Sequence, residues 1–282
     1  MCLLVLAWNV HPRFRLVVAA NRDEFHDRPA APLDWWRDVP GVLAGRDLRG
    51  AGTWMGVSRA GRFGVLTNYR DLEPPPAPDA PSRGEFVPQF LADDAAPRTW
   101  LEGLRRVAGR YAGFNLLVGT DEELFYFSNR NGLEPQPLSP GVYGLSNHLL
   151  DSPWPKLLRA RERLRDLVEV ERVEAEPLFA LLADRAPAEG GAVPHTGLPP
   201  DWERALSAPF VVHGRYGTRC STVLLVERHG RATMLERRFD ASGTQTGASR
   251  WEFEAGGLSP AAATAGVRQP SALRRPLGAS IE

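Results

Sequence analysis

The chain opens on two short apolar runs separated by a turn. Residues 2–8 and 15–20 are almost wholly apolar, and Pro12 lies in the segment between them. This pattern predicts an antiparallel hairpin. If the hairpin turns near Pro12, the numbers of paired residues sum to about 24, which places Cys2 opposite Arg22. The second run leads directly into four polar residues, Asn21, Arg22, Asp23 and Glu24.

Strand patterns and helix patterns then follow in separate blocks. Runs typical of strands cover 42–45, 53–58, 62–68, 114–118, 124–128, 141–145, 218–226, 232–239 and 246–254. Helical patterns begin at Ser82, Trp100, Ser152 and Pro177. Segregated blocks of this kind predict an α+β fold with mainly antiparallel sheets covered by helices, and they argue against a repeated βαβ unit.

Two helix starts carry local signals. Ser82 lies three residues before Glu85, which is the spacing of a capping box. Ser152 and Pro153 predict a cap and a first-turn proline for the longest helix, with Leu158 in its buried stripe. In contrast, the segments 28–40 and 187–207 are interpreted as a loop and as irregular structure.

The chain is interpreted as a single domain over residues 1–255, followed by a tail. Residues 256–282 consist largely of Ala, Pro, Gly and Arg and offer almost nothing to bury, so they are predicted to be disordered. The proline-rich segment 73–81 is predicted to be an exposed loop.

Composition excludes several classes of protein. Lys plus Arg and Asp plus Glu both number 34, so no overall field favours nucleic acid or an anionic membrane. The two cysteines, Cys2 and Cys220, cannot form a disulfide framework, which favours a reducing compartment and a cytoplasmic location. No apolar stretch approaches the roughly 20 residues that cross a bilayer, and no secretory signal is recognisable. The oligomeric state is left open.

Standard catalytic and cofactor motifs are absent from the sequence. It contains no phosphate-binding loop, no nucleophile elbow and no zinc-protease motif. The 6 histidines are scattered without the spacing of metal ligands, so no metal site is predicted.

Cys2 has clear chemical potential because of its position. A small second residue allows removal of Met1, which would leave a free α-amine on the residue that carries the thiol. The ordinary pKa of such an amine is about 7.7–8.0, so it can act as the base for its own side chain. A neighbouring guanidinium would favour the thiolate. The alternative is a buried strand cysteine that merely follows the start codon.

The polar residues after the second strand could complete a site around Cys2. Arg22 could hold the thiolate or a substrate carboxylate, Asp23 could hold the α-ammonium, and Asn21 could donate a hydrogen bond. A solvated strand end is the alternative interpretation of the same residues.

Three later residues are further candidates. Asn68 and Asn147 each follow an apolar run, and asparagine amides are suitable donors to an oxyanion. Ordinary turn residues are the alternative for both. Arg219 stands at the start of a strand and could line a pocket, whereas its neighbour Cys220 is expected to pack in the sheet.

A set of short motifs is spread along the chain in order. The motifs are Met1-Cys2, Asn21-Arg22-Asp23-Glu24, Gly52-Thr53-Trp54-Met55-Gly56, Thr67-Asn68-Tyr69-Arg70, Ser82-Arg83-Gly84, Leu145-Ser146-Asn147, Trp154-Pro155-Lys156 and Tyr216-Gly217-Thr218-Arg219. This set resembles the NRDE family, which is also called TANGO2, for transport and Golgi organisation 2. The resemblance implies a four-layer αββα sandwich of the N-terminal-nucleophile hydrolase type, with two mainly antiparallel sheets between helical layers.

The resemblance also implies an activity. The family is similar at a distance to choloylglycine and penicillin V acylases, which use an N-terminal cysteine. It therefore implies that Cys2 attacks a small acyl-amide and that no cofactor is required for hydrolysis of the C–N bond. The implied catalytic set is Cys2, Arg22, Asp23, Asn68, Asn147 and Arg219.

The resemblance leaves a second class of function open. The same pocket could be a non-catalytic carrier site for haem or for an acyl-CoA or other lipid, because the family has been linked to haem trafficking and to lipid handling. Either class implies a small-molecule ligand and no nucleic-acid partner. A third hypothesis is a partner-binding module on a hydrolase scaffold that has lost its activity.

Overall fold

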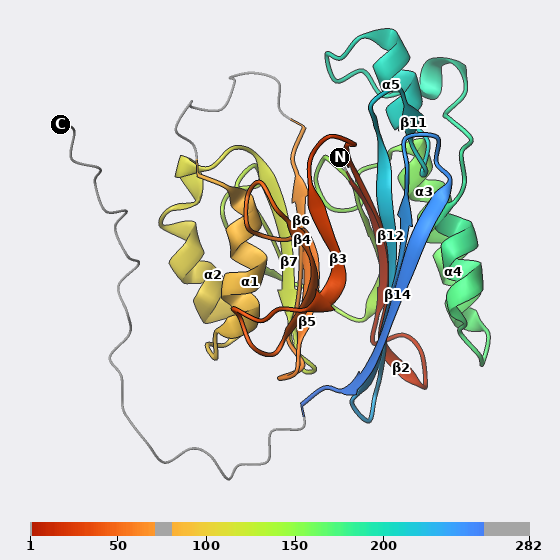
Figure 1. The fold of residues 1–282 in the computed structure, drawn as a ribbon. Helices are drawn as coiled ribbons and strands as arrows, with labels where there is room; N and C mark the ends of the chain where they lie inside the picture. The colour runs from red at the N-terminus through yellow and green to blue at the C-terminus, as the bar shows by residue number, and fades with distance from the viewer. Residues whose placement is uncertain (1, 71–80, 257–282) are drawn as a thin grey trace, which may run out of the picture.

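The computed structural model describes residues 2–70 and 81–256 and has four layers (Figure 1). Two antiparallel sheets are stacked in the middle, and helices cover the outer face of each sheet. The predicted α+β fold, with two antiparallel sheets between helical layers, is confirmed. Most of the predicted loop over 73–81 and of the predicted tail over 256–282, namely residues 73–80 and 257–282, lies outside the described residues.

The first sheet contains the amino-terminal hairpin in its interior. Its strands lie in the order β10 (Gly141–Leu145), β1 (Cys2–Trp8), β2 (Phe14–Phe25), β12 (Tyr216–Glu227), β13 (Arg231–Phe239) and β14 (Gln245–Glu254), and β11 (Val212–His213) also pairs with β12. The strands β2 and β12, each of 12 residues, form the middle of this sheet. The end of β2 is therefore held on both sides, by β1 and by β12.

The second sheet follows chain order. Its strands are β3 (Ala30–Trp35), β4 (Val42–Asp47), β5 (Met55–Ser58), β6 (Phe63–Asn68), β7 (Phe114–Gly119), β8 (Leu124–Ser128) and β9 (Gln136–Pro137). The interpretation of 28–40 as a loop is wrong, because β3 lies within it. Pro32 falls where the register of β3 shifts between Ala31 and Asp34, and a proline at such an edge irregularity hides the strand pattern.

Helices cover the outer faces of the two sheets. The second sheet is covered by α1 (Phe86–Ala92) and α2 (Pro97–Arg105), and the first by α3 (Pro155–Glu169) and α4 (Ala175–Leu182). The helix α5 (Pro200–Leu206) lies beside β11, and short 3₁₀ turns are η1 (Arg83–Glu85), η2 (Ala108–Arg110) and η3 (Gly190–Ala192).

Several local predictions for the helices are wrong. Ser82 makes no capping hydrogen bond, and η1 precedes α1. The first-turn proline of α3 is Pro155 in place of Pro153. Leu158 is 41% exposed and therefore lies outside the buried stripe of α3. The segment 187–207, interpreted as irregular, contains α5, which is too short to show a helical period.

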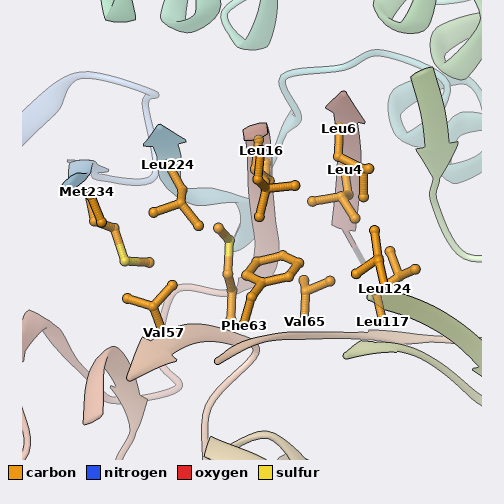
Figure 2. Packing of buried hydrophobic residues seen from close by; sticks show 14 of the residues in the cluster. Leu4, Leu6, Leu16, Val57, Phe63, Val65, Leu117, Leu124, Leu224 and Met234 are labelled. Carbon is orange, nitrogen blue, oxygen red and sulfur yellow. The ribbon is translucent and has the colours of Figure 1, made fainter. Parts of the chain in front are cut away.

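An apolar core fills the space between the two sheets (Figure 2). Leu4 and Leu6 of β1 belong to this core, whereas Leu3 and Val5 belong to the core between the first sheet and its helices. Successive residues of a strand lie on opposite faces. Because both faces of the first sheet are covered, β1 is apolar at every position, which is the continuous run seen in the sequence.

Candidate functional site

The amino-terminal hairpin has the register that the sequence predicts. In the antiparallel pair of β1 and β2, Cys2 pairs with Arg22 and Leu4 pairs with Ala20. On the other side of β1, the pairing with β10 begins at Leu4 and runs to Trp8. The prediction that Cys2 lies opposite Arg22 is confirmed. Within the described pairings, β2 alone neighbours the strand at position 2.

The polar tetrapeptide at the end of β2 is divided between the two faces of the first sheet. Ala20 belongs to the core between the sheets, and Ala19 belongs to the core on the helix side. Strand alternation therefore assigns Arg22 to the face between the sheets, and it assigns Asn21 and Asp23 to the helix side. Neighbouring residues of one short motif thus lie in different environments, one between the sheets and one beneath the helices.

Arg22 is fixed by contacts with the second sheet. Its Nη2 donates to Oδ2 of Asp47 at 2.9 Å, and its guanidinium lies 4.3 Å from the ring centroid of Trp54. Its side chain is 6% exposed, and Nη1 has no hydrogen-bond partner among the described residues. An unsatisfied buried donor costs about 1–3 kcal/mol, and more when it is charged. This Nη1 is therefore suited to donate a hydrogen bond to an acceptor atom of a ligand.

A cavity of about 360 Å³ lies beside Arg22. Its charged and polar lining residues are Arg22, Asp23, Glu24, Arg28, Asp47, Thr53, Asn68, Ser82 and Arg83. They come from the end of β2, the connection to β3, the end of β4 and the turn that follows it, the end of β6 and the approach to α1. Segments that are distant in the sequence therefore converge around Arg22, the residue that pairs with position 2.

Asp23 is buried and hydrogen-bonded, and it also contributes to the cavity lining. Its Oδ1 accepts a hydrogen bond from Oγ1 of Thr218 at 2.7 Å. Burial raises the pKa of Asp23, although Lys156, Thr218 and Arg22 act in the opposite direction. The net shift makes this carboxyl easier to protonate than an exposed one.

Asn68 and Asn147 meet at one side of the cavity but differ in exposure. Nδ2 of Asn147 donates to the backbone carbonyl of Asn68 at 2.9 Å, and the backbone N–H of Arg70 donates to the carbonyl of Asn147 at 2.7 Å. Asn68 is exposed and lines the cavity, whereas Asn147 is buried and is not among the lining residues. Asn147 therefore supports the backbone that carries Asn68.

Arg219 does not line this cavity. It occupies a β-bulge between Thr218 and Cys220, and its Nη1 donates to the carbonyls of Phe25 at 2.8 Å and Arg28 at 2.9 Å. These bonds hold the chain that leaves β2. Cys220 is buried in β12, so the expectation that it packs in the sheet is confirmed.

Asn21 ties the first sheet to its helical layer. Its Nδ2 donates to the carbonyls of Leu182 and Pro209, both at 2.9 Å, and its Oδ1 accepts from Oγ of Ser221 at 2.6 Å. Its amide is thus occupied by bonds within the protein, on the face opposite to Arg22.

Most of the chain is similar to one known protein family. Residues 1–241 match the model of the family described as Transport and Golgi organisation 2. The chain belongs to this family. A relative in Mus musculus, named Transport and Golgi organization 2 homolog, is 34% identical over 272 residues, which cover 89% of this chain and 96% of the relative. The Homo sapiens Transport and Golgi organization protein 2 homolog is 35% identical and covers 84% of this chain and 92% of its own.

More distant matches include a Drosophila relative and a solved structure. The Drosophila melanogaster Transport and Golgi organization protein 2 is 25% identical, with 84% of this chain and 91% of that protein covered. The solved structure is the Caenorhabditis elegans N-acylethanolamine-hydrolyzing acid amidase (NAAA) ortholog, with a TM-score of 0.43 and 11% identity, covering 79% of this chain and 92% of that one.

The cavity residues of this family member that were not predicted as site residues include Arg28, Asp47, Trp54 and Arg83. Trp54 and Arg83 stand inside motifs that carry the family resemblance, so those motifs were a signal for them. Asp47 ends β4 and Arg28 lies in the connection between β2 and β3, and their approach to Arg22 depends on how the two sheets are stacked.

In the part of the chain that the structure describes, every helix is too short or too polar to span a bilayer. Across 2–70 and 81–256, no three His, Cys, Asp or Glu residues are grouped so that they could hold a metal ion.

A buried ion pair supports the Asn68–Asn147 contact. Nη1 of Arg70 lies 3.0 Å from Oε2 of Glu203, and their side chains are 6% and 4% exposed. Burial alone would raise the pKa of Glu203. Hydrogen bonds from Thr196 and Leu198 and the charge of Arg70 outweigh burial, so the pKa is lowered.

We expect Glu203→Gln to destabilise the protein strongly at pH 7 and much less in acid. A carboxylate with a lowered pKa contributes stability above its unfolded value of 4.5, and the contribution is lost as the pH falls through the folded value. At pH 7 the substitution leaves Arg70 without its charged partner, so the free energy of unfolding should fall by about 3 kcal/mol. Urea titrations at neutral and acidic pH measure both values.

The exposed Glu102, paired with Arg98 on α2, supplies the control for this test. Glu102→Gln should change the free energy of unfolding by less than about 0.5 kcal/mol at either pH. An equal loss for Glu203→Gln at both pH values would show that charge is not the cause.

Proposed function

We propose that the protein is a cysteine-dependent amide hydrolase whose nucleophile is Cys2 after removal of Met1. The observation that carries this proposal is the pairing of Cys2 with Arg22, because Arg22 lines a polar cavity of about 360 Å³. A buried guanidinium favours the thiolate form of a neighbouring thiol. The cavity has the size of a small-molecule site, which suits a small acyl-amide.

The proposed reaction is acyl transfer through a thioester. The α-amine of Cys2 takes the thiol proton, and the sulfur adds to the carbonyl carbon, whose oxygen becomes an oxyanion. The C–N bond then breaks, the amine leaves with the proton from the α-ammonium, and a thioester remains. Water adds to the thioester after giving a proton to the α-amine, and the carboxylic acid is released as the thiol is restored.

The neighbouring side chains have separate roles in this proposal. Arg22 stabilises the thiolate, and the exposed amide of Asn68, in the cavity lining, donates to the oxyanion. Asn147 positions Asn68 through its hydrogen bond to the backbone carbonyl. Asp23 holds the α-ammonium by charge attraction, because it follows Arg22 directly at the same end of β2.

We expect the purified protein to lack Met1, because the proton transfer depends on a free α-amine at residue 2. Intact-mass spectrometry should give a mass one methionine residue below that of the full sequence. Cys2→Ser keeps a small second residue and should be processed in the same way, so it serves as the control. Active protein that retains Met1 would rule out this mechanism.

A carrier function is the alternative for the same cavity, and its arginines favour ligands with anionic groups. Arg22, Arg28 and Arg83 would suit the phosphates of an acyl-CoA or the propionates of haem. A carrier would tolerate Cys2→Ser, and it would show a Soret band with haem or a thermal shift with acyl-CoA at micromolar ligand. Turnover that depends on Cys2 would decide against it.

A further inference from the structure

Arg83 is a cationic side chain of the cavity with no ion pair in the part of the chain that the structure describes. Its Nη1 donates to the carbonyl of Gly113 at 2.7 Å, and a neutral carbonyl does not balance its charge. Arg83 is half-buried, and arginines that are withdrawn from water normally have a carboxylate or another anion as partner. An anion bound beside Arg83 would therefore balance its charge.

Two carboxylates of the cavity lie close to arginines other than Arg83. Asp47 accepts from Arg22 at 2.9 Å and from Arg28 at 2.5 Å, and Glu24 lies 3.8 Å from Arg28. Burial lowers the pKa of Arg83, the positive charges of Arg130 and Arg28 lower it further, and the negative charge of Glu24 only partly opposes them. Three arginines and three carboxylates line the cavity, and Arg83 is the one of these arginines that has no carboxylate partner among the described residues.

The same cavity contains a second donor without a partner. Nη1 of Arg22 is buried and has no hydrogen-bond partner among the described residues. Arg22 stands at the end of β2, opposite position 2, and Arg83 stands in η1, so the two guanidinium groups come from different elements around one space. Arg22 pairs with the residue proposed as the nucleophile, and Arg83 could bind a part of the ligand farther from that residue.

The wall between these elements is kept open by Gly50. A Cβ at this position would lie 3.2 Å from Oγ of Ser82, 3.5 Å from Nη2 of Arg28 and 3.6 Å from Oδ1 of Asp47. A side chain here would crowd the polar groups of the lining. The glycine leaves them accessible from the cavity.

We propose that Arg83 binds a carboxylate of the substrate, so that the hydrolysed amide is an anionic one such as an N-acyl amino acid. This inference rests on the proposed function, because it concerns the substrate of the same site. A guanidinium can bind a carboxylate through two parallel hydrogen bonds, which fixes the orientation of the ligand as well as its position. Arg83 would then orient the amide bond toward residue 2.

The test compares N-hexanoylglycine with its neutral analogue N-hexanoylglycinamide. Isothermal titration with the Cys2→Ser protein measures binding of both without turnover. We expect the acid to bind at least about tenfold more tightly, since a charge-assisted hydrogen bond contributes about 1.5–3 kcal/mol. Arg83→Gln should remove this preference by weakening the acid alone, and its amide can still donate to the carbonyl of Gly113.

Two further variants make the test specific. Arg106→Gln changes an exposed arginine of the same helical layer and should leave both affinities unchanged. Arg83→Lys keeps the charge without the planar fork, so it should retain part of the preference for the acid. It also replaces Arg83→Gln if thermal melting shows that the glutamine variant does not fold.

The outcomes separate this inference from the proposed function. Equal binding of the acid and the neutral amide, or equal weakening of both by Arg83→Gln, would overturn the role of Arg83. If wild-type protein hydrolyses the neutral amide as fast as the acid, the hydrolase proposal stands and the anionic substrate fails. If the acid is preferred in binding but neither compound is hydrolysed, the anion site stands and the hydrolase proposal fails.

Discussion

Replacing Cys2 by serine is expected to lower kcat/KM for amide hydrolysis by at least about a thousandfold. A serine hydroxyl is not ionised near neutral pH, so Arg22 can no longer stabilise a formed nucleophile across the β1–β2 pair. The substitution changes one atom of the side chain, and the affinity for substrate should stay within about threefold. Steady-state kinetics and titration calorimetry measure the two effects separately.

Cys220→Ser is the matched control for this prediction. Cys220 is the other cysteine of the chain, and it pairs with Arg22 from the opposite side, in β12. It is buried and lies in the middle of the first sheet. Its substitution should leave kcat/KM within about threefold at temperatures where the variant is folded. A similar loss in both variants would point to a general disturbance of the sheet around Arg22.

Gly52→Ala is expected to lower the free energy of unfolding by about 3 kcal/mol or more. A Cβ at residue 52 would lie 2.1 Å from the carbonyl oxygen of Gly84 and 2.3 Å from its carbonyl carbon, so the backbone itself would have to move. The contact is fixed because the N–H of Thr53 donates to the same oxygen at 3.0 Å. Calorimetry should show a fall in Tm of roughly 6–12 °C.

Gly84→Ala tests the same contact from its other side. A Cβ at residue 84 would have its nearest neighbour, Oγ of Ser82, at 3.5 Å, which is an ordinary van der Waals contact. The variant should therefore melt within about 2 °C of the wild type. A comparable loss for the two substitutions would mean that the close approach of Gly52 to Gly84 is not what limits stability.

The hairpin register could be predicted because it depends on local geometry. Once the turn is placed near Pro12, each residue of β1 has one partner on β2, and the pairing of Cys2 with Arg22 follows. The α+β fold class could also be inferred, since strand patterns and helix patterns occupy separate blocks of the sequence. These features require no knowledge of how distant elements pack.

The surroundings of Arg22 could not be predicted in the same way. Asp47 and Trp54 reach it only because the second sheet is stacked on the first, and a pattern of apolar residues does not specify the relative position of two sheets. The strand β3 was hidden because Pro32 interrupts its pattern at the register shift.

The two asparagines looked alike in the sequence because each ends an apolar run. Their difference arises from a tertiary contact between the sheets: Oγ1 of Thr67, in β6, donates to the carbonyl of Ser146 at 2.9 Å. This bond ties the loop after β10 to the second sheet and buries Asn147, while Asn68 stays exposed beside the cavity.

The division of the tetrapeptide between two faces has a consequence for inherited variation. Asn21 bonds within the helix side of the sheet, so its loss would reduce how much folded protein a cell retains. Loss of Arg22 leaves Asp47 paired with Arg28, so abundance would fall less than ligand binding. Substitutions of these adjacent residues would thus have different effects. Loss of Asn21 would leave too little folded protein, and loss of Arg22 would leave folded protein that is inactive.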